Sequence, residues 1–431
     1  MKISNTSILN ENYEIQHDMD IWIRDGKIVK IQKHSNSLAE EGVKCCEVLE
    51  GRGKLFMPGL IDSHMHTGQQ LLRGKVLDAM PMIWTRIMLP FESTLTPKKM
   101  RLSAGIAALE MIKSGTSGFI DAGSYFMEEA AEVYRTSRLR GALSYSTMDQ
   151  KNLPQSIRDT ARSAIEKTDS LYDAYHGKDH LKIFYSLRAL MSCSEELVQM
   201  ASARAKERNT TLQAHMNEYA GEINYSMEHY QMRPYEYLES LGVLSDRFLG
   251  AHSLLLSENE MELIQEHGVK ICYCPFSNCG KSVPNSPEML RRGVLPGLGT
   301  DGTAHGGMSL WNEMKIFRSV INISHGVPLA EPKIMPAKTI LSMALEGGAA
   351  ALGEVGRLGK LKEGYKADLI GIDLWQPHLL PSGNLVNTLV ESVNANDVVH
   401  MIVDGKLVMK NREVLTMDEE KIMWEAKEVT I

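Results

Sequence analysis

Two histidines lie one residue apart in the segment DSHMH, at residues 62–66, directly after the apolar run LFMPGLI. In a strand, residues i and i+2 point to the same face, so His64 and His66 are expected side by side. Neutral imidazole is the commonest protein ligand for a transition metal, although an isolated pair of this kind is more often a pair of surface histidines. Other residues of the sequence are needed to distinguish a metal site from a pair of surface histidines.

Three more segments end in residues that bind metals or move protons. His215 lies in AHMNE, His252 in GAHS and Asp301 in LGTDG. With His64 and His66, the chain offers four imidazoles and one carboxylate. A set of three imidazoles and one carboxylate suits Zn²⁺, Fe²⁺ or Mn²⁺. We therefore predict a site for one divalent metal ion, with Zn²⁺ as the default and Fe²⁺ or Mn²⁺ as alternatives.

A metal site of this kind performs hydrolysis when one coordination position stays open for water. The metal lowers the pKa of that water from ~15.7 to roughly 7. Glu218 lies three residues after His215, where its carboxyl group can move a proton from the water to a ring nitrogen or a leaving group. His252 is expected to orient the water and to stabilise the charge that develops on it.

These residues need a framework that brings distant segments together, and the sequence has a repeating one. Segments typical of amphipathic helices, such as 96–115, 194–209 and 257–268, alternate with strand-like runs. This alternation predicts βαβ units, and eight runs predict an α/β fold of the closed (β/α)₈ TIM-barrel type. The runs span residues 55–66, 116–123, 140–149, 181–189, 211–218, 247–254, 269–278 and 294–302.

Each run begins with apolar residues, and most end in polar ones. In such barrels the carboxyl ends of the strands carry the active site, so these polar ends are expected to meet at one mouth. Any one of them alone is more often structural than catalytic, but their shared position favours a metal site. The residues expected there are His64, His66, His215, His252 and Asp301.

The two ends of the chain have a different pattern from the barrel. Residues 15–31 and 398–414 each contain an Asp-Gly pair between alternating apolar residues, which predicts a hairpin. We predict that residues 1–57 and 358–431 form one small composite β-sandwich domain beside a barrel domain of residues 58–357. Two unrelated β appendages are the alternative.

The composition limits the remaining possibilities. With 431 residues, 43% hydrophobic and 23% charged, the chain resembles an ordinary globular protein, and its net charge of -7 argues against a nucleic-acid partner. The sequence has no apolar run long enough for a membrane span. Because the start lacks the apolar segment of a secretory signal and the six cysteines show no disulfide framework, we expect a cytoplasmic protein with buried free thiols.

The motifs PGLIDSHMH, HMNE, GAHS, PFSN and LGTDG, in this order, resemble the amidohydrolase superfamily. The most similar group is the ATZ/TRZ-like aminohydrolases, which includes methylthioadenosine/adenosylhomocysteine deaminases, guanine and oxoguanine deaminases, and triazine hydrolases. The resemblance covers essentially the whole chain. It implies that the metal ligands are His64, His66, His215 and Asp301. It implies proton-transfer roles for Glu218, His252 and Asp301, and a homo-oligomer, which is common in this group.

Two-metal members of such barrels use a lysine in the fourth strand as a bridge. The inner part of that strand reads FYSLRA here and has no lysine, while Lys182 lies at the opening end of the strand. This difference favours a single metal ion.

Four residues are candidates for substrate binding, and they favour different classes of substrate. Gln69 and Arg188 resemble positions that bind the base in guanine-type deaminases, and a guanidinium at residue 188 would grip a ring carbonyl. Glu92 resembles a glutamate that contacts the sugar in nucleoside deaminases. His305 lies in the loop TDGTAHGG, where nucleoside deaminases usually read close to TDGAASNN. The segment PFSNCGKSVPNSPE also lacks their SNLKL continuation.

The implied reaction is the hydrolytic loss of ammonia from an aromatic N-heterocycle, a small-molecule substrate. The first hypothesis is a deaminase of a purine-like base, of the guanine or oxoguanine type, or of a pterin-like base. The alternatives are a deaminase of methylthioadenosine, adenosylhomocysteine or adenosine-type nucleosides, and a triazine-type chlorohydrolase. A non-catalytic binding protein on the same scaffold is a fourth possibility, but such scaffolds usually lose their ligands.

Overall fold

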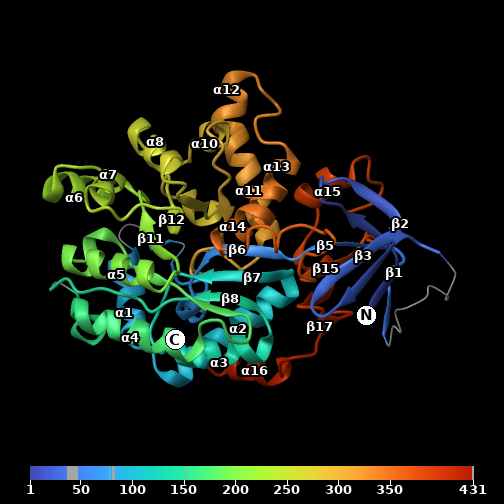
Figure 1. Ribbon diagram of the computed structural model, residues 1–431, viewed down its shortest axis with the longest axis horizontal. Coiled ribbons are helices and arrows are strands. Elements are labelled where there is room, and N and C mark those ends of the chain that lie inside the picture. The colour runs from blue at the N-terminus through green and yellow to red at the C-terminus, as the bar shows by residue number, and fades with distance from the viewer. Residues whose placement is uncertain (36–46, 77, 80–82, 152, 430–431) are drawn as a thin grey trace.

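The computed structural model describes residues 1–35, 47–76, 78–79, 83–151 and 153–429. Figure 1 shows a barrel of strands and helices and, beside it, a β-sheet formed by both ends of the chain. The predicted α/β barrel with a composite β domain is therefore confirmed. The boundaries at residues 58 and 358 stay a prediction.

The barrel is formed by parallel strands in two hydrogen-bonded groups, β6-β7-β8-β9 and β10-β11-β12-β13-β14. Strands β9 and β10 are separated only by Phe184, so the nine segments make eight barrel strands. A parallel bridge between Met65 and Asp301 joins the two ends of the ring. The strands are β6 (Leu60–Met65), β7 (Thr116–Asp121), β8 (Arg140–Leu143), β9 (Leu181–Ile183), β10 (Tyr185–Leu187), β11 (Leu212–Met216), β12 (Phe248–His252), β13 (Lys270–Tyr273) and β14 (Gly297–Leu298).

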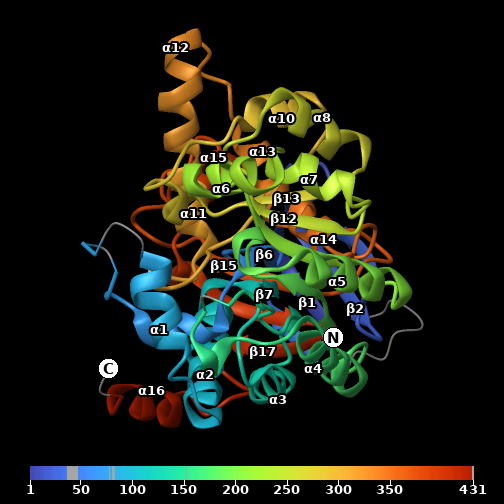
Figure 2. The same cartoon turned by 90° about the vertical axis from the view of Figure 1, so that its left-hand side faces the viewer.

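Helices surround these strands, as Figure 2 shows with β6, β7, β12 and β13 in the middle of the molecule. The predicted helical segments are confirmed as α2, α5 and α8, and their starts are capped by the side chains of Thr96, Ser194 and Ser257. The helices of the barrel are α1 (Leu89–Glu92), α2 (Pro97–Ser114), α3 (Met127–Ser137), α4 (Ala161–Tyr175), α5 (Glu195–Glu207), α6 (Ala220–Tyr230), α7 (Pro234–Ser240), α8 (Glu258–Glu266), α9 (Pro275–Asn278), α10 (Ser286–Arg291), α11 (Leu310–Ile321), α12 (Val327–Leu329), α13 (Ala337–Ser342) and α14 (Gly348–Ala351).

In the described residues the sheet beside the barrel has nine strands, with their own apolar core of residues such as Ile21, Phe56 and Ile402. Its strands are β1 (Lys2–Leu9), β2 (Ile15–Arg24), β3 (Lys27–Lys33), β4 (Val48–Glu50), β5 (Lys54–Pro58), β15 (Leu369–Asp373), β16 (Val398–Val403), β17 (Lys406–Lys410) and β18 (Glu413–Val414). Both predicted hairpins are present, β2–β3 and β16–β17. The run 55–66 is divided at Gly59, because β5 belongs to this sheet and β6 to the barrel. Helices α15 (Leu385–Glu391) and α16 (Glu419–Lys427) complete the C-terminal part.

The inside of the barrel is apolar below the strand ends. Side chains from several strands, including Ile61, Ile120, Phe184 and Leu249, form one buried cluster. This packed floor leaves the polar residues at the carboxyl ends as the lining of the mouth.

Four cysteines lie in the described ranges, and all four are free thiols: Cys193, Cys272 and Cys274 are buried, whereas Cys279 is exposed. Cys45 and Cys46 lie outside the described residues. No helix in the described part of the chain is both long and apolar enough to cross a membrane.

Candidate active site

The first strand of the barrel ends in the two histidines that the sequence singled out. His64 and His66 are both buried at the carboxyl end of β6. Asp62, two residues earlier, accepts hydrogen bonds from the backbone N–H of His64 at 3.2 Å and from that of Thr300 at 3.1 Å. Because a Cβ atom on Gly299 would lie 2.7 Å from the carbonyl oxygen of His64, glycine is required where the last strand passes the first. These contacts hold the two strand ends together.

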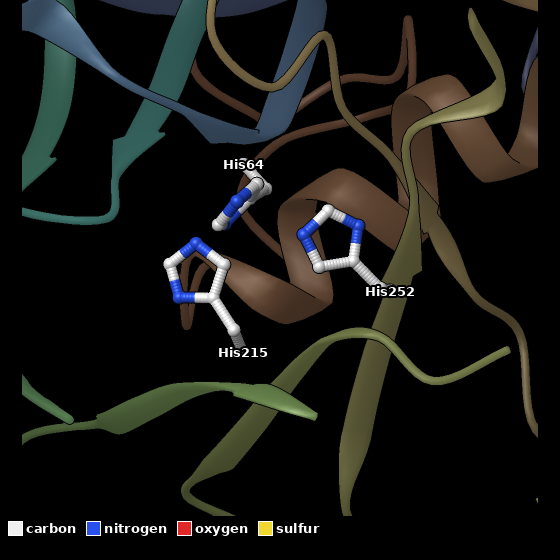
Figure 3. Close-up of side chains that lie close together, drawn as sticks. All are labelled: His64, His215 and His252. Atoms are coloured by element: carbon white, nitrogen blue, oxygen red, sulfur yellow. The ribbon is translucent and has the colours of Figure 1, made fainter. Parts of the chain in front are cut away.

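Two more histidines reach the same point from the other side of the barrel. Figure 3 shows the rings of His64, His215 and His252 facing one another, from β6, β11 and β12. The ring centroids of His215 and His252 lie 4.8 and 5.0 Å from that of His64. The Nε2 atoms of His66 and His215 are 3.2 Å apart.

Asp301 completes this cluster through the bridge that closes the barrel. Its backbone N–H donates to the carbonyl oxygen of His64 at 2.9 Å. One carboxylate oxygen, Oδ1, lies 3.3 Å from Nε2 of His66 and 3.7 Å from Nε2 of His64. The other, Oδ2, accepts a hydrogen bond from the Ser277 hydroxyl at 2.6 Å. One oxygen therefore faces the histidines while the other is held in place.

These residues fit a metal ion. Both ring nitrogens of His64 are buried without a hydrogen-bond partner, which is costly unless another group satisfies them. Two nitrogens bound to one tetrahedral zinc ion at about 2.1 Å would lie about 3.4 Å apart, close to the separation of the His66 and His215 nitrogens. His64, His66 and Asp301 present ligand atoms that all lie within 4.8 Å of one another. A divalent cation between them would satisfy these atoms together.

The charges of the cluster agree with this fit. Burial, followed by the charge of Arg188, lowers the pKa of His66 to about 3. Burial and neighbouring histidines hold the pKa of His64 and His215 well below the usual value. The imidazoles are therefore neutral at pH 7 and present lone pairs. Burial raises the pKa of Asp301, but the contacts with His66 and Lys281 outweigh burial and lower this pKa. The Asp301 carboxylate is therefore ionised.

The hydrogen bonds around His252 determine which of its ring nitrogens carries the proton. The amide oxygen of Asn278 accepts from the backbone N–H of Cys274 at 2.9 Å, which turns the amide nitrogen toward Nδ1 of His252, at 3.0 Å. Nδ1 must accept that hydrogen bond, so Nε2 carries the hydrogen and points toward Oε1 of Glu218, 3.6 Å away. A protonated Nε2 acts as a donor and not as a metal ligand.

The sequence did not single out Lys281, which lies between the two carboxylates of the site. Its ammonium group contacts Oε1 of Glu218, donates to the Ser277 hydroxyl at 2.7 Å and lies 3.7 Å from Oδ2 of Asp301. The signal was its position three residues after the PFSN motif, within the segment that departs from SNLKL.

The four candidate substrate-binding residues occupy two different places. Gln69, Arg188 and His305 line a cavity of 630 Å³ together with His66, His215, Glu218 and Asp301. Glu92, at the end of α1, lies behind Gln69 and Arg188. Its Oε1 accepts from Gln69 Nε2 and from Arg188 Nη2, each at 2.9 Å. It also lines a second cavity of 700 Å³ with Tyr125 and Tyr145.

Comparison with known proteins relates this site to a family. A sequence profile of the Amidohydrolase family matches residues 55–408. The 5-methylthioadenosine/S-adenosylhomocysteine deaminase of Acetivibrio thermocellus is 32% identical over 99% of this chain and 98% of its own. The 5'-deoxyadenosine deaminase of Methanosarcina mazei is also 32% identical, over 94% of this chain and 91% of its own.

A solved structure has the same fold. The crystal structure of an adenosine deaminase from Xanthomonas campestris with bound zinc superposes with a TM-score of 0.92, at 23% identity, over 99% of this chain and 97% of that one. The barrel and the sheet from both chain ends are therefore common to the two proteins.

Proposed function

This chain belongs to the amidohydrolase family, and we propose that it is a metal-dependent hydrolase that removes ammonia from a cyclic amidine. The observation that carries this proposal is the meeting of His64, His66, His215 and Asp301 at one mouth, with Glu218 beside them. The names of the relatives, all deaminases, support the same reaction.

In the proposed mechanism His64, His66, His215 and Asp301 hold one divalent cation, with zinc as the default. The cation would supply Lewis acidity that makes water a nucleophile at neutral pH. Glu218 accepts a proton from the attacking water and gives it to the ring nitrogen of the amidine. His252, through its Nε2–H, donates to the attacking oxygen. Asp301 takes the second proton and passes it to the amino group, which leaves as ammonia.

For the substrate, we propose a heterocycle in which the amino-bearing carbon adjoins a lactam, as in guanine-type and pterin-type bases. Because Gln69 Nε2 must donate to the Glu92 carboxylate, the amide oxygen is the acceptor that this side chain has left, and it is buried without a hydrogen-bond partner. Arg188 beside it offers donors. An acceptor next to donors complements the N–H and C=O of a lactam, and the adenine ring of an adenosine-type nucleoside has neither group.

A second candidate is an adenosine-type nucleoside. Both relatives described above act, by their names, on such compounds. The cavity also extends beyond the base-binding end, to Trp84, Asn224 and Tyr225, and its 630 Å³ leaves room for a sugar.

An ammonia-release assay on the zinc-loaded protein separates the candidates. Guanine, oxoguanine and pterin would be compared with adenosine, 5'-methylthioadenosine and 5'-deoxyadenosine. We expect the lactam compounds to have the higher kcat/KM, and Gln69→Met to lower it for them more than for the nucleosides. A wide margin in favour of the nucleosides would establish the second candidate. Chloride release from a chlorotriazine without ammonia release from any compound would contradict both.

A further inference from the structure

We infer that Lys281, acting with Ser277, is a positioning residue that holds the proton-transfer group Glu218 at a fixed place relative to the metal ligand Asp301. This inference rests on the proposed function, because it assumes that Glu218 transfers the proton. It concerns residues to which that mechanism gives no role.

Lys281 and Ser277 connect the carboxylates of Glu218 and Asp301 through a continuous series of contacts. The ammonium group of Lys281 contacts Oε1 of Glu218 and donates to the Ser277 hydroxyl oxygen at 2.7 Å. The Ser277 hydroxyl uses its own hydrogen to donate to Oδ2 of Asp301 at 2.6 Å. Lys281 acts as the donor to Ser277 and Ser277 as the donor to Asp301, so the hydrogen bonds run in one direction toward the Asp301 carboxylate.

Glu218 needs such a partner because its backbone alone does not fix its side chain. The residue lies two positions after the end of β11, and its N–H donates to Glu222 at 2.9 Å. His252 is also near its carboxylate, but Nε2 of His252 is 3.6 Å from Oε1, too far for a hydrogen bond. Lys281 therefore makes the close contact that selects the orientation of the carboxylate.

The charges favour the same role. Glu218 and Asp301 are both carboxylates in one buried site, and like charges there repel strongly. The ammonium group of Lys281 lies between them, whereas the charge of Arg188 is already paired with Glu92. Removal of Lys281 would let the carboxylates move apart, and Glu218 would leave the position from which it reaches the substrate.

The test is a double-mutant cycle on the zinc-loaded full chain, with Lys281→Met, Glu218→Gln and the combination of both. We expect Lys281→Met to lower kcat about 10- to 100-fold, as the loss of supporting contacts does at metal sites. KM should change by less than about threefold, because the inference gives the lysine a contact with Glu218 and none with the substrate. Lys281→Arg should recover part of kcat. In the Glu218→Gln background Lys281→Met should have no further effect.

Lys270→Met serves as the matched control. This lysine is the first residue of β13, at the end of the strand that lies away from the mouth. Its ammonium group donates to the carbonyl oxygen of Gly268. Its loss should leave kcat unchanged.

Two further measurements do not depend on turnover. Lys281→Met should bind the same amount of zinc as the wild type, and its crystal structure should show the Glu218 carboxylate displaced. An unchanged Glu218 position, an unchanged kcat, or an equal loss of kcat in the Glu218→Gln background would overturn the inference. If the wild type released no ammonia from any heterocycle, the proposed function would fail, and the Glu218 position would still decide the positioning role. If Lys281→Met did not fold, Ser277→Ala would replace it in the cycle.

Discussion

Arg188 and Glu92 form a buried ion pair beside Gln69 at the wall of the active-site cavity, with Nη2 2.9 Å from Oε1. The pair neutralises a guanidinium whose charge acts on His66 and His215, two of the predicted metal ligands, and it orients Gln69 through the same carboxylate oxygen. A glutamate expected to touch substrate thus has a clear second role, because it sets the positions of two residues that line the cavity.

Substitution of Glu92 by glutamine tests this role through stability. The change leaves the Arg188 charge buried without its partner, so we expect a loss of about 3 kcal/mol in the free energy of unfolding, measured by denaturant titration. Glu128→Gln is the control, because Glu128 is an exposed carboxylate on α3. A loss of equal size in both variants would contradict the account.

Glu218→Gln tests the proton-transfer role. The amide keeps the size of the side chain but cannot take a proton from water, so we expect kcat to fall about 10²- to 10⁴-fold. Zinc content, measured by atomic emission, should stay at the wild-type level because Glu218 is not assigned as a ligand. Retained activity in this variant would show that another group carries the proton.

Asp301→Ala should behave differently, because the carboxylate is assigned to both metal binding and proton transfer. We expect the variant to lose zinc and activity together. If its zinc content equalled that of the wild type after dialysis, the assignment of Asp301 as a ligand would be wrong.

A pH effect on stability is expected far from the site, at His400 in β16. The ring is buried and stacked on Phe56, and burial, with the charges of Lys54 and Lys410, lowers its pKa to about 4. Between this value and the usual ~6.5 the unfolded chain binds a proton that the folded chain does not, so stability falls as the pH decreases through this range.

The contribution of His400 is isolated by comparison with His400→Gln. From pH 7 to pH 4, the free energy of unfolding of the wild type should fall by about 3 kcal/mol more than that of the variant. Urea titrations at several pH values measure it. Parallel stability curves would mean that His400 titrates normally in the folded protein.

The sequence predicted those parts of the molecule that depend on local patterns. The amphipathic helices that became α2, α5 and α8, the two Asp-Gly hairpins and the polar strand ends all follow from residue types at short spacing. The convergence of the strand ends follows from the barrel rule, and it places His215 beside His64 and His66, which in turn lie beside Asp301.

The remaining features depend on contacts between distant segments. The run 55–66 reads as one strand, and only the pairing of β5 with β1 and β15 shows that it belongs to two sheets. Glu92 lies 96 residues from Arg188, and Lys281 lies 63 residues from Glu218. No periodicity in the sequence marks such pairs, because the barrel and not the local chain brings them together.

The central claim is that His64, His66, His215 and Asp301 hold one divalent cation. Anomalous X-ray diffraction at the zinc absorption edge, on crystals of the zinc-loaded protein, tests it most directly. The account predicts one strong peak among these four side chains, at about 2.0 to 2.2 Å from their ligand atoms. A map without a peak there, or with its main peak elsewhere in the chain, would contradict it.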